Sequence, residues 1–266
     1  MESILKVEDL CVSFKGPEGS FRVVDSISFE VEVGKITCVV GQSGSGKSMT
    51  ALSLINMVPL PGKVSGKVIF KDRNLLDLCF KEMREIRGRH IFSIFQHPIN
   101  SLNPSIKIGK QLFKFAKSHG MSENKQFYKE IAEILDTLNF VNSNIVLDQY
   151  PFQLSGGMLQ RVMIALAIWM KPEIIIADEP TTALDAIVQK EILKQFSMIR
   201  KMFDVSLLLI THDLGVVAEI ADNVIVMKEG KVVEKGNVYK IFNNPQDPYT
   251  KSLLSATFRK EAGLVC

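Results

Sequence analysis

A glycine-rich stretch near the start of the chain constrains the possible folds more than any other feature. Residues 41–48 read Gly-Gln-Ser-Gly-Ser-Gly-Lys-Ser, which fits the pattern G-x-x-x-x-G-K-[ST]. The run Ile36–Val40, apolar except at Thr37, precedes it, and a segment with helical spacing, Lys47–Met57, follows it. Continuous apolar runs are typical of strands buried inside a parallel sheet. The stretch therefore predicts a strand, a tight loop and a helix, the elements that build α/β folds.

The same stretch predicts a phosphate-binding loop. Its glycines let the backbone curl until several N–H groups point at one anion, and the helix start adds the positive end of its dipole. The ammonium of Lys47, expected on a surface loop, would reach the β- and γ-phosphates, and the hydroxyl of Ser48 would bind Mg²⁺. A chance match in a chain of this length has a probability on the order of 0.01. The candidate nucleotide-binding residues here are Gly41, Ser43, Gly44, Ser45, Gly46, Lys47 and Ser48.

A second apolar run ends in two carboxylates. Ile174–Ala177 is followed directly by Asp178 and Glu179. Open α/β sheets bind their ligands at the carboxyl ends of the strands, so we expect Asp178 to hold Mg²⁺ and Glu179 to polarise the water that attacks a phosphate. The plainer alternative is that these residues only begin a turn before Pro180. The intact loop at residues 41–48 favours the catalytic interpretation.

The rest of the core follows the same pattern. Apolar runs at 91–95 and 206–210 predict two more buried strands, and residues 187–203 have the apolar spacing of a helix. Strand, helix and strand in this order predict a parallel sheet flanked by helices. Near the C-terminus, Glu229-Gly230 joins two short strand patterns at 224–227 and 231–234, which predicts a hairpin.

Two regions differ from this core. Residues 5–31 alternate apolar and polar side chains around a turn at 16–19, which predicts half-buried antiparallel strands. Residues 99–165 show no convincing strand pattern and are expected to be helical, with Ser122 and Ser155 as N-caps. The predicted helices there span 106–118, 122–139 and 155–170. The predicted fold class is therefore α/β, with a parallel core sheet, an N-terminal antiparallel β-subdomain and an inserted helical subdomain.

Composition excludes several classes of protein. With 46% hydrophobic and 23% charged residues, the chain is close to globular averages, which excludes wholesale disorder. A net charge of +3 without a concentrated basic stripe gives no support for nucleic-acid binding. The longest apolar run, Val162–Met170, is well short of the roughly 18 residues that suggest a membrane span. The four cysteines form no CxxC pair, which favours buried, reduced thiols in a cytosolic chain.

One motif distinguishes this chain from the many other proteins with such loops. Residues 154–158, Leu-Ser-Gly-Gly-Met, place a second anion-binding turn at the start of a helix. This turn resembles the signature motif of the ATP-binding cassette (ABC) ATPases. The resemblance implies a P-loop fold and a sandwich dimer, in which Ser155, Gly156 and Gly157 contact the γ-phosphate held by the other subunit.

Three further motifs of that family lie in order along the chain. The resemblance implies that Gln96 is the Q-loop glutamine, that Asp185 closes the D-loop at residues 182–185, and that His212 is the switch histidine. The catalytic residues would then be Glu179, His212 and Gln96. The Mg²⁺ ligands would be Ser48, Gln96 and Asp178.

An aromatic side chain from the N-terminal hairpin usually stacks on the adenine in this family. Phe14 is at the expected place, and Phe21 is the alternative. A phenylalanine that only fills the core of the hairpin is the structural explanation for the same residue.

Two segments narrow the resemblance to one branch of the family. Residues 96–104 and 244–254 are similar to those of the oligopeptide and nickel importers, and Met158 stands where the usual signature ends in glutamine. Within the branch, residues 155–161 and the short tail, with Cys266 as its one cysteine, are more similar to the nickel type. Nickel or a nickel chelate is thus the expected cargo, with dipeptides or oligopeptides as the alternative.

The resemblance implies the ATP-hydrolysing subunit of an importer, with ATP and Mg²⁺ as cofactors. Its expected partners are a second ATPase subunit, identical or paralogous, two transmembrane permeases and, indirectly, a substrate-binding protein. The chain would lie at the cytoplasmic face of the cell membrane. The ABC domain is expected over residues 1–244, with the helical subdomain inserted at about 99–165 and a short tail at 245–266. A soluble cassette ATPase that acts on ribosomes or DNA, and a regulatory nucleotide-binding module without turnover, are the rival interpretations.

Overall fold

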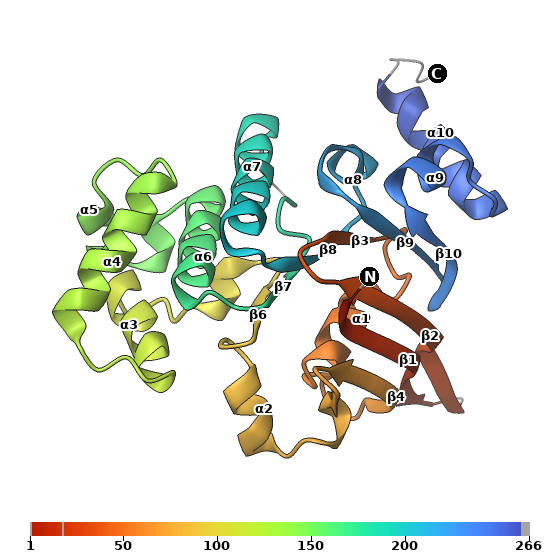
Figure 1. Cartoon of the computed structure of the whole chain (residues 1–266), viewed down its shortest axis with the longest axis horizontal. Helices are drawn as coiled ribbons and strands as arrows, with labels where there is room; N and C mark the ends of the chain where they lie inside the picture. The colour runs from red at the N-terminus through yellow and green to blue at the C-terminus, as the bar shows by residue number, and fades with distance from the viewer. Residues whose placement is uncertain (1, 18, 183, 262–266) are drawn as a thin grey trace. The chain divides into compact units, whose positions relative to one another are not determined.

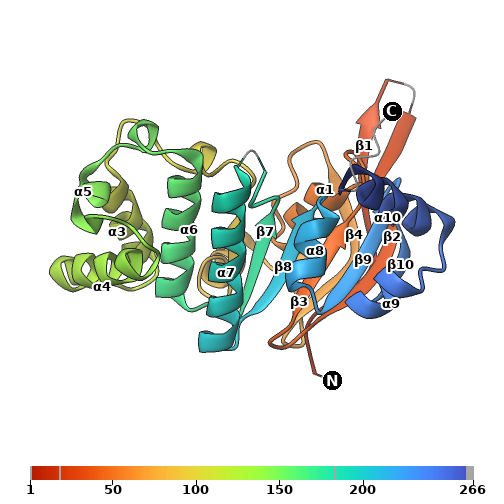
Figure 2. The same cartoon turned by 90° about the horizontal axis from the view of Figure 1, so that it is seen from above.

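The computed structural model describes residues 2–17, 19–182 and 184–261. The chain divides into two compact units. The first unit comprises Met1–Met83 and Ser206–Cys266, and the second comprises Arg84–Val205. Figure 1 and Figure 2 label the elements of both units. No helix among the described residues is long and apolar enough to cross a membrane.

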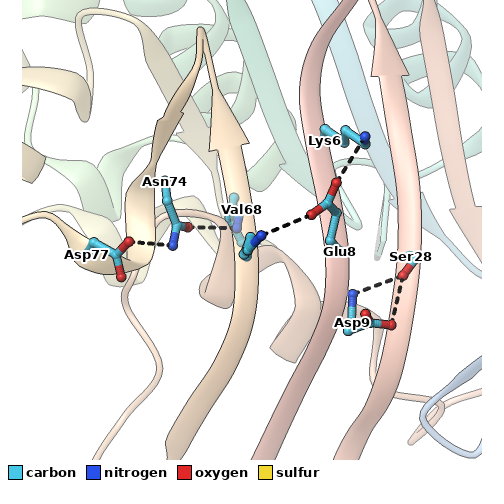
Figure 3. A network of polar contacts seen from close by, with 8 residues as sticks. Lys6, Glu8, Asp9, Ser28, Val68, Asn74 and Asp77 are labelled. Atoms are coloured by element: carbon cyan, nitrogen blue, oxygen red, sulfur yellow. Dashed lines mark hydrogen bonds and ion pairs between the residues drawn. The ribbon is translucent and has the colours of Figure 1, made fainter.

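An antiparallel sheet opens the first unit. Its strands, in the order β2-β1-β4-β5, are β1 (Ser3–Gly16), β2 (Gly19–Glu32), β4 (Lys63–Phe70) and β5 (Arg73–Asn74). Leu5 and Val7 are buried on one face of β1. On the other face Glu8 forms ion pairs with Lys6 at 2.9 Å and with Lys67 of β4 at 3.7 Å (Figure 3). The half-buried antiparallel strands predicted from the sequence are therefore confirmed.

A bulge in β1 explains why the apolar positions switch from odd to even numbers along this strand. Between Val7 and Leu10 the register with β2 shifts, and Asp9 has a φ of 47°. The Asp9 N–H donates to Ser28 Oγ at 2.9 Å (Figure 3), so a side chain replaces the lost ladder bond. The extra residue keeps Leu10 and Val12 buried like the apolar residues before it.

In the first unit, the glycine-rich loop follows a buried strand, β3 (Ile36–Val40), that has a parallel neighbour on each side. β3 runs parallel to β8 (Ser206–Thr211) and to β9 (Asn223–Lys228), and β10 (Lys231–Asn237) pairs antiparallel with β9. Every residue of β3 and β8 is buried, as their apolar runs predict. The helices of this unit and of its boundary are α1 (Lys47–Leu54), η1 (Leu75–Asp77), α2 (Phe80–Ile86), α8 (Leu214–Ile220), α9 (Val238–Asn243) and α10 (Pro248–Glu261).

The second unit carries a pair of parallel strands and most of the helices. β6 (Ile91–Ile94) pairs with β7 (Ile174–Asp178). The segment between them forms η2 (Pro98–Ser101), α3 (Ile108–Ser118), α4 (Asn124–Thr137), α5 (Ser143–Asp148), η3 (Pro151–Gln153) and α6 (Gly156–Met170). α7 (Ala186–Phe203) follows β7 and lies beside α6 in both views (Figures 1 and 2). The three helices expected from the sequence in this segment are present.

A ring contact fixes α4 on α6. The rings of Phe127 and Trp169 meet edge to face with centroids 5.0 Å apart, and Trp169 Nε1 donates to Glu130 Oε2 at 2.8 Å. The indole thus buries its apolar surface while its polar atom keeps a partner.

Several predicted helix boundaries were wrong: α3 begins at Ile108 rather than at residue 106, and α4 ends at Thr137 rather than at residue 139. α4 begins at Asn124, and Glu123 rather than Ser122 occupies the N-cap position, without a side-chain cap bond. α1 ends at Leu54, before the predicted Met57, because Asn56 adopts a left-handed φ of 50° that a helix cannot continue through.

The cysteines differ in their exposure. Cys38 in β3 is buried, and burial, with the nearby Asp222 carboxylate, raises the pKa of its thiol. Cys11 is half-buried and Cys79 is exposed, so the expectation of buried thiols holds only for Cys38. Cys266 lies outside the described residues.

Candidate nucleotide site

The glycine-rich loop of the first unit lies tightly against two strands. A side-chain carbon added to Gly41 would lie 2.2 Å from the carbonyl oxygen of Met227 in β9, and one added to Gly46 would lie 2.6 Å from that of Val23 in β2. Gly46 also has a φ of 98° and is the N-cap of α1. Only glycine fits both the close approach and the left-handed backbone at this position.

Main-chain hydrogen bonds hold the middle of the loop. Ser45 N–H donates to Gln42 O at 3.2 Å, which closes the turn, and Gly230 N–H donates to Ser45 O at 3.1 Å. Gly230 belongs to the predicted β9–β10 hairpin turn and itself accepts from Asp25 N–H at 2.8 Å. The loop therefore takes its shape from backbone contacts to the strands beside it.

Lys47 is buried, which corrects the expectation that it lies on a surface loop. Its exposed fraction is 5%, and its Nζ donates to the carbonyl oxygens of Gly41 at 2.8 Å and Gln42 at 2.9 Å. The expectation was wrong because the loop folds over the side chain and turns two carbonyls toward the ammonium. The exposed residues of the motif are Gln42, Ser43, Gly44 and Ser48.

The two aromatic candidates for the adenine contact lie together. Phe14 and Phe21 are paired in register across β1 and β2, with ring centroids 6.0 Å apart and planes 25° from parallel. Phe21 is 54% exposed, and Phe14 is half-buried between Phe21 and the loop at Gly62. The pair offers one stacked aromatic surface at the tip of the hairpin, and the choice between the two rings stays a prediction.

In the second unit, the Glu179 carboxylate is held by two side chains. Glu179 Oε2 accepts from Gln96 Nε2 at 3.1 Å and from Thr182 Oγ1 at 2.7 Å. Gln96 follows β6, and Asp178, only 9% exposed, is the last residue of β7. The parallel pairing of β6 and β7 brings Gln96 and Glu179, which are far apart in sequence, within hydrogen-bond distance.

The backbone at Glu179 is unusual. Its φ of 46° lies in the left-handed region, which costs a residue with a side chain of order 1–3 kcal/mol, and such residues cluster at active sites. Thr182 N–H donates to Glu179 O at 3.2 Å, which closes a turn after Pro180. This turn brings the Thr182 hydroxyl back to the carboxylate. Thr182 was predicted only as the start of the D-loop, and its contact with Glu179 was missed. The spacing of three residues between Glu179 and Thr182, with Pro180 between them, could have indicated this contact.

The Ser-Gly-Gly turn begins α6 as predicted. Ser155 is the N-cap of α6, and its Oγ accepts from Met158 N–H at 3.2 Å. Ser155 and Gly156 are exposed, while Gly157 is buried, and a side-chain carbon there would lie 2.7 Å from Val188 of α7. Gly157 therefore permits close packing of α6 against α7. Ser155 and Gly156 form the exposed part of the turn, at a helix start whose first N–H groups have no partner within the helix.

The last two predicted residues lie at other helix starts. The Asp185 carboxylate caps α7 by accepting from Ile187 N–H and Val188 N–H, both at 3.0 Å. Ala183 of the D-loop lies outside the described residues. In the first unit, His212 is exposed directly after β8, before Asp213, which caps α8.

Comparison with known proteins decides the family. The sequence model described as ABC transporter matches residues 24–182, more than half of the chain. The chain belongs to the ABC transporter family. It is an ABC-type ATPase with the P-loop fold, and this confirms the predicted fold class.

Relatives of this ABC ATPase cover nearly the whole chain. It is 45% identical to the dipeptide transport ATP-binding protein DppD of Bacillus subtilis over 261 residues, 97% of this chain and 78% of that protein. It is 38% identical to the oligopeptide transport ATP-binding protein OppD of Escherichia coli over 98% of this chain and 77% of that protein. Both relatives are peptide-transport proteins by name.

Solved structures of ABC proteins have the same fold. cbiO1 from Clostridium perfringens, part of an ABC transporter complex, matches with a TM-score of 0.75 and 26% identity, over 99% of this chain and 96% of that one. The dimeric bacterial ABC transporter cassette MJ0796 matches with a TM-score of 0.78 and 26% identity, over 88% of this chain and 98% of that one. MJ0796 has also been solved as a dimer bound to ADP and phosphate.

Proposed function

We propose that this ABC ATPase is the ATP-hydrolysing subunit of an importer for dipeptides or oligopeptides. The support for this cargo is the identity of 45% to a dipeptide transport protein over 97% of the chain. The similarity of residues 96–104 and 244–254 to this branch points the same way. Nickel, the cargo that the short tail and residues 155–161 favoured, has no support from the relatives described above, so peptides replace it here.

The first unit binds the phosphates in this proposal. The loop backbone, the start of α1 and the Lys47 ammonium provide the positive field. Ser45 Oγ is buried without a hydrogen-bond partner among the described residues, and a phosphate oxygen supplies one. The stacked pair of Phe14 and Phe21 receives the adenine.

The proposed Mg²⁺ ligands fit the ion by chemistry. Ser48 offers a hydroxyl, Asp178 a carboxylate and Gln96 a side-chain carbonyl, and oxygen atoms of these kinds are the ligands that Mg²⁺ takes, together with phosphates and water. Gln96 uses its Nε2 on Glu179, which leaves Oε1 for a cation. When bound, Mg²⁺ neutralises charge on the β- and γ-phosphates.

Glu179 is the proposed general base, and its contacts carry the catalytic part of the proposal. Gln96 and Thr182 both donate to Oε2, and these two bonds orient the carboxylate that takes a proton from the attacking water. His212 completes the catalytic set. The Ser-Gly-Gly turn, exposed at Ser155 and Gly156, acts with Asp185 at the start of α7 on the γ-phosphate held by a second subunit.

The proposed partners follow from this arrangement. They are a second ATPase subunit, identical or paralogous, two permeases and, through them, a substrate-binding protein, at the cytoplasmic face of the membrane. Support comes from MJ0796, a similar cassette solved as a dimer, and from the transport names of the relatives.

The test is transport by the assembled complex. The chain is co-purified from native membranes, placed in vesicles with its permeases and binding protein, and supplied with ATP and Mg²⁺. A set of di- to pentapeptides and NiCl₂ are compared for stimulation of phosphate release. The proposal expects stimulation by peptides and none by Ni²⁺. Stimulation by Ni²⁺ alone would restore the nickel interpretation, and recovery of the chain without any membrane protein would contradict the importer.

A further inference from the structure

The segment after residue 244 reaches back to the phosphate loop. Gln42 N–H donates to the phenolic oxygen of Tyr249 at 3.0 Å. Tyr249 is the second residue of α10, a helix that follows all the family motifs in the sequence. The loop is thus bound by a side chain from a segment that sequence analysis treated as a separate tail.

One rigid peptide plane links Tyr249 to Lys47. The carbonyl of Gly41 and the N–H of Gln42 belong to the same peptide group. Its oxygen accepts from Lys47 Nζ at 2.8 Å, while its N–H donates to Tyr249. In a planar trans peptide these two groups point in opposite directions. Lys47 and Tyr249 therefore hold the plane from its two sides, and a rotation of the plane disturbs both contacts.

The backbone before and after Tyr249 is anchored to the core of the first unit. Asp247 Oδ1 caps α10 by accepting from Tyr249 N–H at 2.8 Å and from Thr250 N–H at 3.3 Å. Glu234 of β10 accepts from Gln246 N–H at 2.8 Å and from Asp247 N–H at 3.1 Å. Partial burial raises the pKa of Glu234, but the two backbone bonds oppose this effect, and the pKa lies below its usual value. The anchoring carboxylate is therefore ionised at neutral pH.

The ring of Tyr249 has its own support. Lys228 Nζ lies 5.3 Å from the ring centroid, a distance at which a cation attracts the ring face. Lys228 ends β9, and the turn that follows it holds the loop at Ser45 through Gly230. The phosphate loop is therefore held at Ser45 by the turn after β9 and at Gln42 by Tyr249 of α10.

We propose that Tyr249 is a positioning residue for ATP binding, whose hydroxyl fixes the Gly41–Gln42 peptide and, through it, the ammonium of Lys47. The proposal rests on the phosphate-binding role proposed above for residues 41–48. It makes the start of α10 part of the nucleotide site, so that a displacement of this helix changes the affinity for ATP. A loop that is ordered before binding pays less entropy when the nucleotide arrives.

The test compares two tyrosine variants of the full chain. Tyr249→Phe removes only the hydroxyl. Tyr239→Phe makes the same change on α9, where the side chain is 77% exposed, and serves as the control. Affinity is measured with a ribose-labelled fluorescent ATP analogue in the presence of Mg²⁺, and KM and kcat are measured by phosphate release. Tyr249→Phe is expected to weaken ATP binding and raise KM by about two- to tenfold, the effect of one hydrogen bond, while kcat at saturating ATP is kept.

Each outcome decides between the proposals. An unchanged affinity and KM in Tyr249→Phe, with an active wild-type chain, overturns the positioning role and leaves the ATPase function intact. A lower kcat at an unchanged KM also overturns it, because a smaller folded fraction gives that result. A wild-type chain that binds no ATP overturns both this inference and the function on which it rests.

Discussion

The phosphate loop and the turn at Glu179 are held by different kinds of contact. The loop takes its shape from main-chain hydrogen bonds and from glycines that approach neighbouring strands closely, as at Gly41 and Gly46. The turn places its carboxylate by two side-chain donors, Gln96 and Thr182. We infer that substitutions in these two regions have different effects. Substitutions in the loop abolish nucleotide binding, and substitutions in the turn abolish hydrolysis.

The largest expected effect is on the rate, at Glu179. Glu179→Gln keeps the size of the side chain and removes the group that accepts a proton, which typically costs about 10²–10⁴-fold in rate. Steady-state phosphate release measures it, with ATP affinity determined on the same sample. The affinity should stay within about twofold of wild type, since Asp178 is unchanged. Turnover at the wild-type rate would exclude Glu179 as the base.

Lys47→Ala, in contrast to Glu179→Gln, should lower the affinity for ATP. Loss of the ammonium removes the charge that meets the phosphates, and we expect tight ATP binding to be lost. Because Lys47 is buried on two carbonyls, the free energy of unfolding should also fall, by about 1–3 kcal/mol. Urea unfolding without nucleotide measures this second effect. A variant with full stability would contradict the buried position of the side chain.

The glycines test whether close packing shapes the loop. A side-chain carbon at Gly41 would overlap Met227 O, whereas one at Gly44 would meet nothing within 4 Å, although both positions have positive φ. Gly41→Ala should therefore lower the unfolding free energy by about 2 kcal/mol more than Gly44→Ala, which retains only the backbone strain of about 1–2 kcal/mol. Thermal unfolding without nucleotide compares them. Equal losses would show that packing against β9 does not shape the loop.

A smaller effect on the rate than that of Glu179→Gln is expected at Thr182. Thr182→Val keeps the shape and removes the 2.7 Å hydrogen bond to Glu179, which should lower kcat about tenfold, the effect of losing roughly 1.5 kcal/mol at a charged acceptor. KM for ATP should be unchanged. Thr137→Val, on the exposed end of α4, is the matched control. A rise in KM without loss of kcat would place Thr182 in binding rather than in catalysis.

The phosphate loop was easier to predict from the sequence than the turn at Glu179. The loop motif consists of residues close together in the sequence, whereas the turn depends on a contact between residues far apart in the sequence. The motif at 41–48 is local, because glycines, helix start and preceding strand all lie within a dozen residues. The contact between Gln96 and Glu179 depends on β6 pairing with β7 across the helical segment, and no local pattern shows it. Burial of Lys47 was missed because it results from a loop that folds over its own side chain.

The contact between Tyr249 and Gln42 was missed for the same reason. Tyr249 meets Gln42 although 207 residues separate them, and the pattern around Tyr249 looks like an ordinary helix start. The short elements β4, α5, α8 and α9 have too few turns or alternations for a clear period. In contrast, the apolar runs of β3, β7 and β8 were predicted nearly to the residue, because strands buried on both faces have few polar positions.

We infer that ATP binding depends on the phosphate loop and ATP cleavage on Glu179, and one measurement tests this claim directly. Wild type, Lys47→Ala and Glu179→Gln are incubated with Mg²⁺ and ATP labelled on the γ-phosphate, passed through a desalting column and analysed for intact ATP on the protein. We predict that Glu179→Gln retains intact ATP close to one per chain, that wild type retains less because it cleaves it, and that Lys47→Ala retains none. Intact ATP retained equally by both variants, or lost equally from both, would contradict the claim.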